Sequence, residues 1–410
     1  MMALLKMSCI FVLILLNCLA WIVHGSHFLG GTITWRLLNQ SATGTPVAVV
    51  ITQTYSWSYS LITCTNAMIS SNQLIPTSSY PLLLTATLNC IANCTSGAIG
   101  YVAPNIRPRC TNISPSLGIT VGQRSDTVSI EAGSDFSVAY QDTAWRPLAS
   151  SASAAWSVSS RIQLTIRPDN SLYNNAPTAS LMSPINIPYN QSTAIYIPVA
   201  DADGDITRCR WSTSLNGVNE CGGVCPPGSL PANTMIYPNC TIIIIDQTIG
   251  DWFAITLMVE DFINSSSIDP LSSVPVQFLV QVVSPPGCTI APEIIGIPLE
   301  QACIPLSVGQ TFNSELMAVN NCGLSVTIVD IATLSFSGMI QGNIAQLNTT
   351  IYYKTLSWIP TTAQIGFQVM CAMALDSQNA QSAQYCFKFY VSETSACACP
   401  GETCITTTTT

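Results

Sequence analysis

Sixteen cysteines that follow an apolar leader constrain this chain more than any other feature. The sequence holds eighteen cysteines, and Cys9 and Cys18 lie within its first 25 residues. Residues 1–25 have the form of a secretory signal, with Lys6 ahead of an apolar run and small residues before Ser26, where we expect cleavage. The alternative is an uncleaved signal anchor, because the run approaches the roughly 20 residues that a membrane-spanning helix needs.

Export explains the cysteines, because an even number in an exported chain is expected to form disulfides. The sixteen fall into four groups along the chain: Cys64, Cys90, Cys94 and Cys110; Cys209, Cys221, Cys225 and Cys240; Cys288, Cys303, Cys322, Cys371 and Cys386; and Cys397, Cys399 and Cys404. The first two groups can each close internally, with three connectivities open in each. The third group is odd, so one member is expected to pair with the last. Zinc is a weak rival, because His27 is the single histidine after the leader.

Glycosylation sequons agree with export. The pattern N-x-[ST] occurs at Asn39, Asn93, Asn112, Asn190, Asn239, Asn264 and Asn348. Each is an expected acceptor for an N-linked glycan. We therefore expect a secreted or cell-surface glycoprotein.

Composition excludes several classes of protein. Charged residues make up 8% of the chain and hydrophobic residues 48%, which is not the composition of a disordered acidic protein. Twelve Lys and Arg against twenty-one Asp and Glu give a net charge of −9 and no basic stripe, so nucleic acid is not an expected partner. After the leader no run is as long as a membrane span, so an anchor would have to follow Thr410 or be the leader itself.

Periodicity predicts an all-β protein. Runs rich in β-branched and aromatic residues cover 47–57, 161–166, 241–245 and 276–283, and clusters of Gly, Pro, Ser and Asn separate them. Helical periodicity is hard to find. Short strands with such turns are typical of β-sandwiches.

A weak repeat sets the expected modules. Residues 251–261 and 366–376 each read as a strand that ends in aspartate, and a turn and a last strand follow each; 135–142 with 161–166 is a looser third copy. The modules predicted from this repeat are 26–168, 176–284 and 288–393. The latter two are close to the roughly 100 residues of an immunoglobulin-like sandwich. Residues 394–410 are rich in cysteine and threonine, and we expect a tail or the start of a glycosylated stalk.

Three carboxylates, Asp201, Asp203 and Asp205, lie in one turn between two expected strands. Alternate residues of an extended segment share a face, and Gly204 lets the backbone fold tightly. Two interpretations remain open. The cluster holds calcium, which prefers oxygen ligands, or the aspartates stabilise the turn through their own backbone.

This region resembles cadherin-like repeats. Ala200-Asp-Ala-Asp203 is similar to the A-x-D-x-D at the end of a cadherin strand, and Asn174-Asn175-Ala176-Pro177 resembles the linker N-D-N-A-P. The segment from Leu356 to Gly366, with Ala374-Leu-Asp-Ser377, is similar to the x-W-x-P-T-x-x-Q-x-G…A-x-D-S pattern of immunoglobulin-like and cadherin-like repeats. The resemblance implies tandem β-sandwich modules with Trp211 and Trp358 in their cores, and a role in adhesion.

The opening Ser26-His-Phe-Leu-Gly-Gly-Thr-Ile-Thr-Trp35 looks like that of a group of uncharacterised invertebrate secreted or surface proteins. That resemblance covers most of the chain after the leader. It implies no activity.

Catalysis is not expected. A histidine base would have to be His27, and no G-x-S-x-G nucleophile motif is present. Glu260 and Asp261 are adjacent and would point to opposite faces of a strand, so they cannot flank one glycosidic bond. We therefore predict a secreted or surface-tethered glycoprotein for adhesion or extracellular recognition, with a protein or a glycan as partner. The alternatives are a structural coat or matrix component and, less favoured, a carboxylate-dependent glycoside hydrolase.

Overall fold

The computed structural model describes residues 27–246, 248–288, 290–394 and 399. The expected leader, Cys397, Cys404 and nearly all of the tail lie outside these residues. The prediction of an all-β protein is confirmed: in the described residues, helix is limited to α2 (Asn66–Ser70) and the 3-10 turns η1 (Pro81–Leu84) and η2 (Thr362–Gln364). None of the helical segments described here has the length and apolar character needed to cross a membrane.

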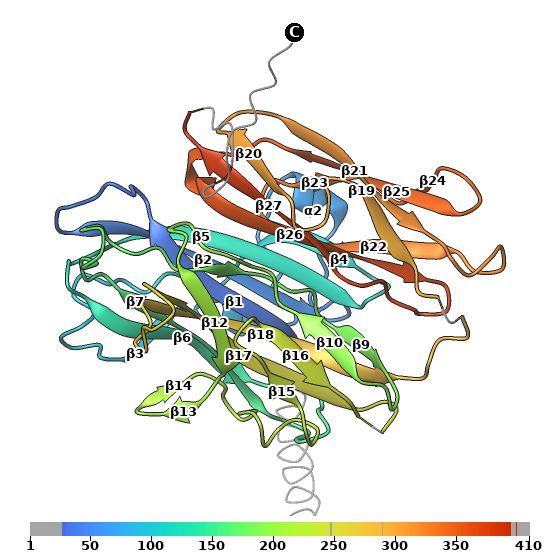
Figure 1. Ribbon diagram of the computed structural model, residues 1–410, viewed down its shortest axis with the longest axis horizontal. Helices are drawn as coiled ribbons and strands as arrows, with labels where there is room; N and C mark the ends of the chain where they lie inside the picture. The colour runs from blue at the N-terminus through green and yellow to red at the C-terminus, as the bar shows by residue number, and fades with distance from the viewer. Residues whose placement is uncertain (1–26, 247, 289, 395–398, 400–410) are drawn as a thin grey trace, which may run out of the picture.

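One large sheet organises the N-terminal two thirds of the chain (Figure 1). Its main path runs β3-β6-β7-β18-β1-β2-β5-β4, and β17, β12 and β9 join it through β18. The strands are β1 (Phe28–Leu37), β2 (Val47–Ser58), β3 (Asn89–Ala92), β4 (Arg109–Ser114), β5 (Ile119–Ile130), β6 (Asp135–Thr143), β7 (Ala155–Gln163), β9 (Ile185–Pro188), β12 (Ile206–Trp211), β17 (Trp252–Phe262) and β18 (Ser272–Val283).

Strand β18 is shared between the two expected modules. One edge of β18 pairs with β17 along ten residues, from Ser272 to Gln281. Its other edge pairs in succession with β7 at Ser273, with β1 at Val276 to Phe278, and in parallel with β9 from Val280. The buried apolar residues of 28–282 accordingly form one continuous core. The division at 26–168 and 176–284 stays a prediction about folding units, and the shared sheet leads us to expect that both unfold together.

Smaller sheets complete this body. They are β8 (Thr178–Ala179) with β11 (Val199–Ala200); β10 (Thr193–Tyr196), β16 (Thr241–Ile244) and β15 (Met235–Ile236); and β13 (Ser214–Leu215) with β14 (Val218–Asn219).

The C-terminal residues form a separate sandwich of two sheets, which lies above the large sheet in Figure 1. One sheet contains β19 (Glu293–Ile297), β21 (Phe312–Val319), β25 (Ile351–Trp358), β23 (Ile340–Gln341) and β24 (Ala345–Gln346); the other contains β20 (Cys303–Ser307), β27 (Tyr385–Ser392), β26 (Gly366–Asp376) and β22 (Ile328–Leu334). Trp358 is 1% exposed in the core between them, whereas Trp211 is only partly buried against the larger core.

The four-stranded sheet of this sandwich is apolar on both faces. One face carries Phe387 and Phe389 into its own core. Leu334, Cys371 and Met373 instead belong to the larger core of the N-terminal body. The C-terminal sandwich is therefore docked on that body through buried apolar residues, because the outer face of the sheet would otherwise expose them to water.

Cysteine pairing follows the four groups. The described residues contain the disulfides Cys64–Cys110, Cys90–Cys94, Cys209–Cys240, Cys221–Cys225, Cys288–Cys322, Cys303–Cys399 and Cys371–Cys386. The first two groups each close on themselves, and the odd third group pairs with the tail through Cys399. Because the two Cys-x3-Cys pairs are bonded internally, their thiolates are not available to zinc.

The repeated aspartate has a structural reason. Asp261, next to last in β17, and Asp376, the last residue of β26, are 0% and 1% exposed, and each accepts a hydrogen bond from a backbone nitrogen beyond the turn that follows. Ser272 N donates to Asp261 at 2.6 Å, and Ala380 N donates to Asp376 at 2.8 Å. The predicted strand 161–166 is wrong in its second half, because β7 ends at Gln163 and residues 164–167 belong to no strand before the turn that begins at residue 168.

A substitution at Gly30 tests the pairing of β1 with β18. Its φ is +140°, and a Cβ there would lie 2.2 Å from the carbonyl oxygen of Gln277 on β18. We expect Gly30→Ala to lower the free energy of unfolding by about 2 kcal/mol or more, through strain and overpacking. Gly44→Ala is the matched control, because no atom lies within 4 Å of its Cβ position. Urea denaturation measures both variants, and equal midpoints would contradict the role given to this contact.

Candidate functional site

The turn after β11 brings the three predicted carboxylates together. One oxygen each of Asp201, Asp203 and Asp205 lies within 4.8 Å of the others. Asp201 Oδ1 also accepts from the backbone nitrogens of Asp203 at 2.9 Å and Asp205 at 3.0 Å. The aspartate therefore stabilises its own turn, as one of the two interpretations of the sequence required.

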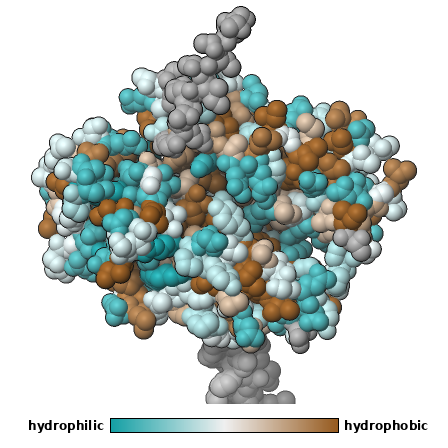
Figure 2. Space-filling view, in the orientation of Figure 1, coloured by the Kyte–Doolittle hydropathy of each residue, from teal (hydrophilic) through white to brown (hydrophobic). Residues whose placement is uncertain are grey.

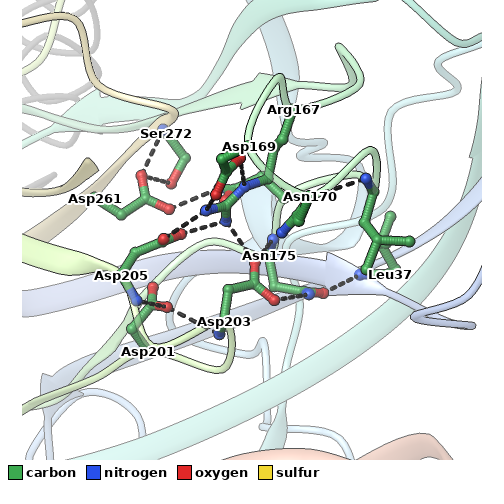
Figure 3. A network of polar contacts seen from close by, with 12 residues as sticks. Leu37, Arg167, Asp169, Asn170, Asn175, Asp201, Asp203, Asp205, Asp261 and Ser272 are labelled. Atoms are coloured by element: carbon green, nitrogen blue, oxygen red, sulfur yellow. Dashed lines mark hydrogen bonds and ion pairs between the residues drawn. The ribbon is translucent and has the colours of Figure 1, made fainter. Parts of the chain in front are cut away.

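Arg167, which was not among the predicted site residues, enters this turn from the linker between β7 and β8 (Figure 3). Its Nη1 and Nη2 donate to the two oxygens of Asp205 at 2.5 and 2.6 Å. Its Nε and Nη2 donate to Asp169 at 3.0 and 2.8 Å, and Nη1 lies 3.4 Å from Asp203 Oδ2. The Arg167 side chain is 3% exposed, so water contributes little to its solvation.

Two asparagines extend the network. Asn175 donates from N and Nδ2 to Asp203 at 2.7 and 2.9 Å, and its Oδ1 accepts from Leu37 N at the end of β1. Asn174 donates to Asp261 Oδ2 at 2.6 Å and accepts from Arg167 Nη1 at 2.9 Å. The linker is thus fixed to β1, to the aspartate turn and to the end of β17. We call Arg167, Asp169, Asp201, Asp203, Asp205 and Asp261 the Arg167 cluster.

The cluster holds more carboxylates than cations. Burial, followed by the nearby Asp261 carboxylate, raises the pKa of Asp201 to about 8. Burial likewise raises the pKa of Asp261 to about 6 and raises the pKa of Asp203. The hydrogen bonds from Arg167 lower the pKa of Asp169. The Asp201 and Asp261 carboxyl groups, which accept no hydrogen bond from Arg167, therefore favour the protonated form more than Asp169 does, and this relieves part of the surplus negative charge.

Calcium in this turn would compete with these contacts. Calcium takes six to eight oxygen ligands. Both oxygens of Asp203 accept from Asn175, both of Asp205 accept from Arg167, and Asp201 Oδ1 accepts from two backbone nitrogens. Calcium binding by Asp201, Asp203 and Asp205 stays a prediction. Because Arg167 occupies oxygens that calcium would need, its test must compare the protein with and without Arg167.

A second candidate site is a groove of about 740 Å³ between the N-terminal body and the C-terminal sandwich. Helix α2 and β4 form one wall, and β22 and β23 form the other. Asn66 Nδ2 donates across it to Asn343 Oδ1 at 3.2 Å. At its floor Lys354 Nζ lies 3.3 Å from Asp330 Oδ1, and Ser114 Oγ donates to Asp330 Oδ2 at 2.6 Å.

The groove combines amides, hydroxyls and aliphatic side chains. Gln341 and Ser70 contribute polar groups, and Ile340 and Ile344 contribute apolar surface. Lys354 and Asp330, 7% and 8% exposed, are the charged residues among those that line it, and they neutralise each other. A ligand of this groove would therefore meet a polar surface with no net charge.

His27 belongs to an aromatic cluster in the core. It is 5% exposed, and its ring lies 4.1 Å from that of Tyr80 and stacks on Trp57 at 5.6 Å between centroids. Tyr80 in turn contacts the Asp142 carboxylate. The histidine therefore packs among aromatic rings in the core.

Six of the seven sequon asparagines, at 39, 93, 190, 239, 264 and 348, are exposed. Asn112 is the exception, at 1% exposure. Its Nδ2 donates to Thr333 Oγ1 at 2.6 Å, and its Oδ1 accepts from Ser335 N at 2.9 Å. A glycan on Asn112 is incompatible with this packing against β22, so the expectation for that sequon is wrong in the folded arrangement.

Comparison with known proteins gives only remote likenesses. No protein-family model matches the sequence, and no curated protein matches it. Among solved structures, the sialic acid binding region of a Streptococcus sanguinis SK1 adhesin is 10% identical over 53% of this chain and 77% of that chain, with a TM-score of 0.18. The N-terminal Ig1-2 module of Drosophila receptor protein tyrosine phosphatase DLAR is 10% identical over 53% and 98%, with a TM-score of 0.20.

The EC1-3 fragment of protocadherin gamma C5 is 9% identical over 52% of this chain and 66% of that chain, with a TM-score of 0.20. Endo-fucoidan hydrolases also match weakly. These matches include immunoglobulin-like and cadherin-like modules, but at such TM-scores the β-sandwich assignment depends on the sheets described above. The matches carry no argument about function, and the resemblance to invertebrate surface proteins stays a prediction.

Removing Arg167 tests the cluster as a structural element. We expect Arg167→Gln to lower the free energy of unfolding by about 3–5 kcal/mol, because Asp205, whose side chain is 5% exposed, would be left buried and unpaired. Arg161→Gln is the control: Arg161 pairs with Asp135, but these side chains are 31% and 37% exposed, and we expect a loss of about 1 kcal/mol or less. Chemical denaturation of both variants gives the comparison, and similar losses would show that burial of the Arg167 cluster contributes nothing special.

Proposed function

We propose that this protein is exported and serves in adhesion or extracellular recognition, outside the cell or at its surface. Disulfides persist in oxidising compartments, and seven connect the described residues. The predicted leader over 1–25 and the six exposed sequons are consistent with that route. Apolar and hydrophilic residues are interspersed over the face shown in Figure 2, so apolar patches do not dominate that face.

The groove between the N-terminal body and the C-terminal sandwich is the observation that carries the proposal. Its volume of about 740 Å³ is within the range of ligand sites, and such sites occur preferentially where modules meet. The two walls are held in fixed register by buried hydrogen bonds, including Asn112 to Thr333 and Ser114 to Asp330, both at 2.6 Å. A site built on rigid strands is preformed, which lowers the entropic cost of binding.

The lining favours an uncharged polar ligand, and we propose a neutral glycan. The Asn66 amide donates one N–H to Asn343, and its second N–H and its Oδ1 suit sugar hydroxyls, whereas the Gln341 amide already pairs with Thr333 and Ser335. The paired charges of Lys354 and Asp330 offer no net attraction to an ionic partner. A protein segment is the other ligand that the binding assay below would detect.

Two alternatives remain distinguishable. A coat or matrix protein would self-assemble without binding a soluble ligand. A glycoside hydrolase needs two carboxyl groups flanking the bond, and Asp330 is the one carboxylate among the residues that line the groove, where Lys354 pairs with it. Hydrolysis of chromogenic glycosides would favour the hydrolase, and concentration-dependent assembly alone would favour the coat.

The groove is tested by a matched pair of variants on a panel of immobilised glycans and cell surfaces. Ile340 in the groove is 50% exposed, and Ile297, outside it on β19, is 77% exposed. We expect saturable glycan binding by the native protein. Ile340→Arg should bind at least about tenfold more weakly, because a long charged side chain would fill the groove. A tenfold loss of affinity corresponds to about 1.4 kcal/mol of binding free energy.

The control variant Ile297→Arg adds the same charge to the same sandwich and is expected to bind like the native protein. If both variants bind glycan equally weakly, the added positive charge, and not obstruction of the groove, causes the loss of affinity. The absence of any saturable glycan binding by the native protein would contradict the proposal.

A further inference from the structure

Arg167 contacts the aspartate turn for which the sequence left calcium open as one of two interpretations. Here a single guanidinium from the linker contacts Asp205 twice, at 2.5 and 2.6 Å, and Asp169 twice, at 3.0 and 2.8 Å. Figure 3 shows the guanidinium between these two carboxylates, with Asp203 beside it.

The guanidinium and a calcium ion would need the same oxygens. Calcium binds six to eight oxygens at about 2.3–2.6 Å. A guanidinium presents five N–H donors in a rigid plane that matches a carboxylate edge to edge. Because Arg167 engages both oxygens of Asp205 and approaches Asp203 at 3.4 Å, an ion bound by this turn would have to displace it.

Other residues of the chain donate hydrogen bonds to the remaining carboxylates of the Arg167 cluster. Asn175 satisfies Asp203, and Asn174 with Ser272 satisfies Asp261. Asp201 Oδ2 is the exception: it is buried and has no hydrogen-bond partner among the described residues. The carboxylate oxygens of the turn therefore already surround a cation, the Arg167 guanidinium, and Asp201 Oδ2 is the one without a hydrogen-bond donor among the described residues.

We propose that Arg167 is the built-in cation of this linker, that it takes the place of calcium in the native protein, and that its removal converts the aspartate turn into a calcium site. The linker between β7 and β8 is then fixed to β1 and to β17 at any calcium concentration. Removal of the guanidinium leaves five clustered carboxylates, and a divalent ion of oxygen preference is the ligand best able to neutralise them. This inference does not depend on what the groove binds.

The test compares the full secreted chain with Arg167→Gln, each melted in excess calcium chloride and in excess EDTA. For the native protein we expect the same melting temperature in both, within about 1 °C, since a ligand that does not bind the folded state cannot stabilise it. For Arg167→Gln we expect a lower melting temperature in EDTA and a rise of about 4 °C or more in calcium. Magnesium should give a smaller rise, because it demands octahedral geometry and gives up water reluctantly.

A double variant locates the ion. Arg167→Gln combined with Asp205→Asn should lose the response to calcium, because it removes a central ligand of the new site. If Arg167→Gln does not fold, calcium titration calorimetry on the native protein still decides: no binding supports the inference, and stoichiometric binding overturns it. A native melting temperature that falls on chelation, or a folded Arg167→Gln that ignores calcium, would also overturn it.

Discussion

Pairing between β1 and β18 is the contact on which the rest of the structure depends. Residues near the start of the described chain, Gly30 to Thr32, lie beside Val276 to Phe278 in one sheet. The strands between them must therefore be accommodated within that sheet or packed against it, and the core of 28–282 is continuous as a result. Such a long-range pairing costs chain entropy that grows only slowly with loop length, so it is compatible with a stable fold.

The position of the linker and of the C-terminal sandwich follows from the pairing of β1 with β18. The linker after β7 lies against strands of the shared sheet. Arg167 holds it to the aspartate turn, Asn175 holds it to β1, and Asn174 holds it to β17. The C-terminal sandwich then docks through an apolar sheet face and through buried polar contacts such as Asn112 with Thr333. That docking creates the groove, so the proposed binding site exists only when both parts are in place.

Much of the local structure could be predicted from the sequence, because strands and hairpins produce recognisable patterns of residues over a short stretch of the chain. The repeated aspartates at 261 and 376 marked two hairpins, and cysteine spacing marked which groups close on themselves. The partner of β1 could not be predicted, since sheet pairing over such separation leaves no periodic signal. Arg167 was missed for the same reason. The available hint was the scarcity of cations: with twelve Lys and Arg against twenty-one Asp and Glu in the chain, each arginine is a candidate partner for an expected cluster of carboxylates.

Native-state hydrogen exchange tests most directly whether residues 28–283 form one folding body. Amides of β2, in the first expected module, and of β17, in the second, should exchange through openings of the same free energy as denaturant is added, because one cooperative unit opens both. Exchange of the β17 amides through a lower-energy opening that leaves β2 protected would show two independent modules, and would contradict the account.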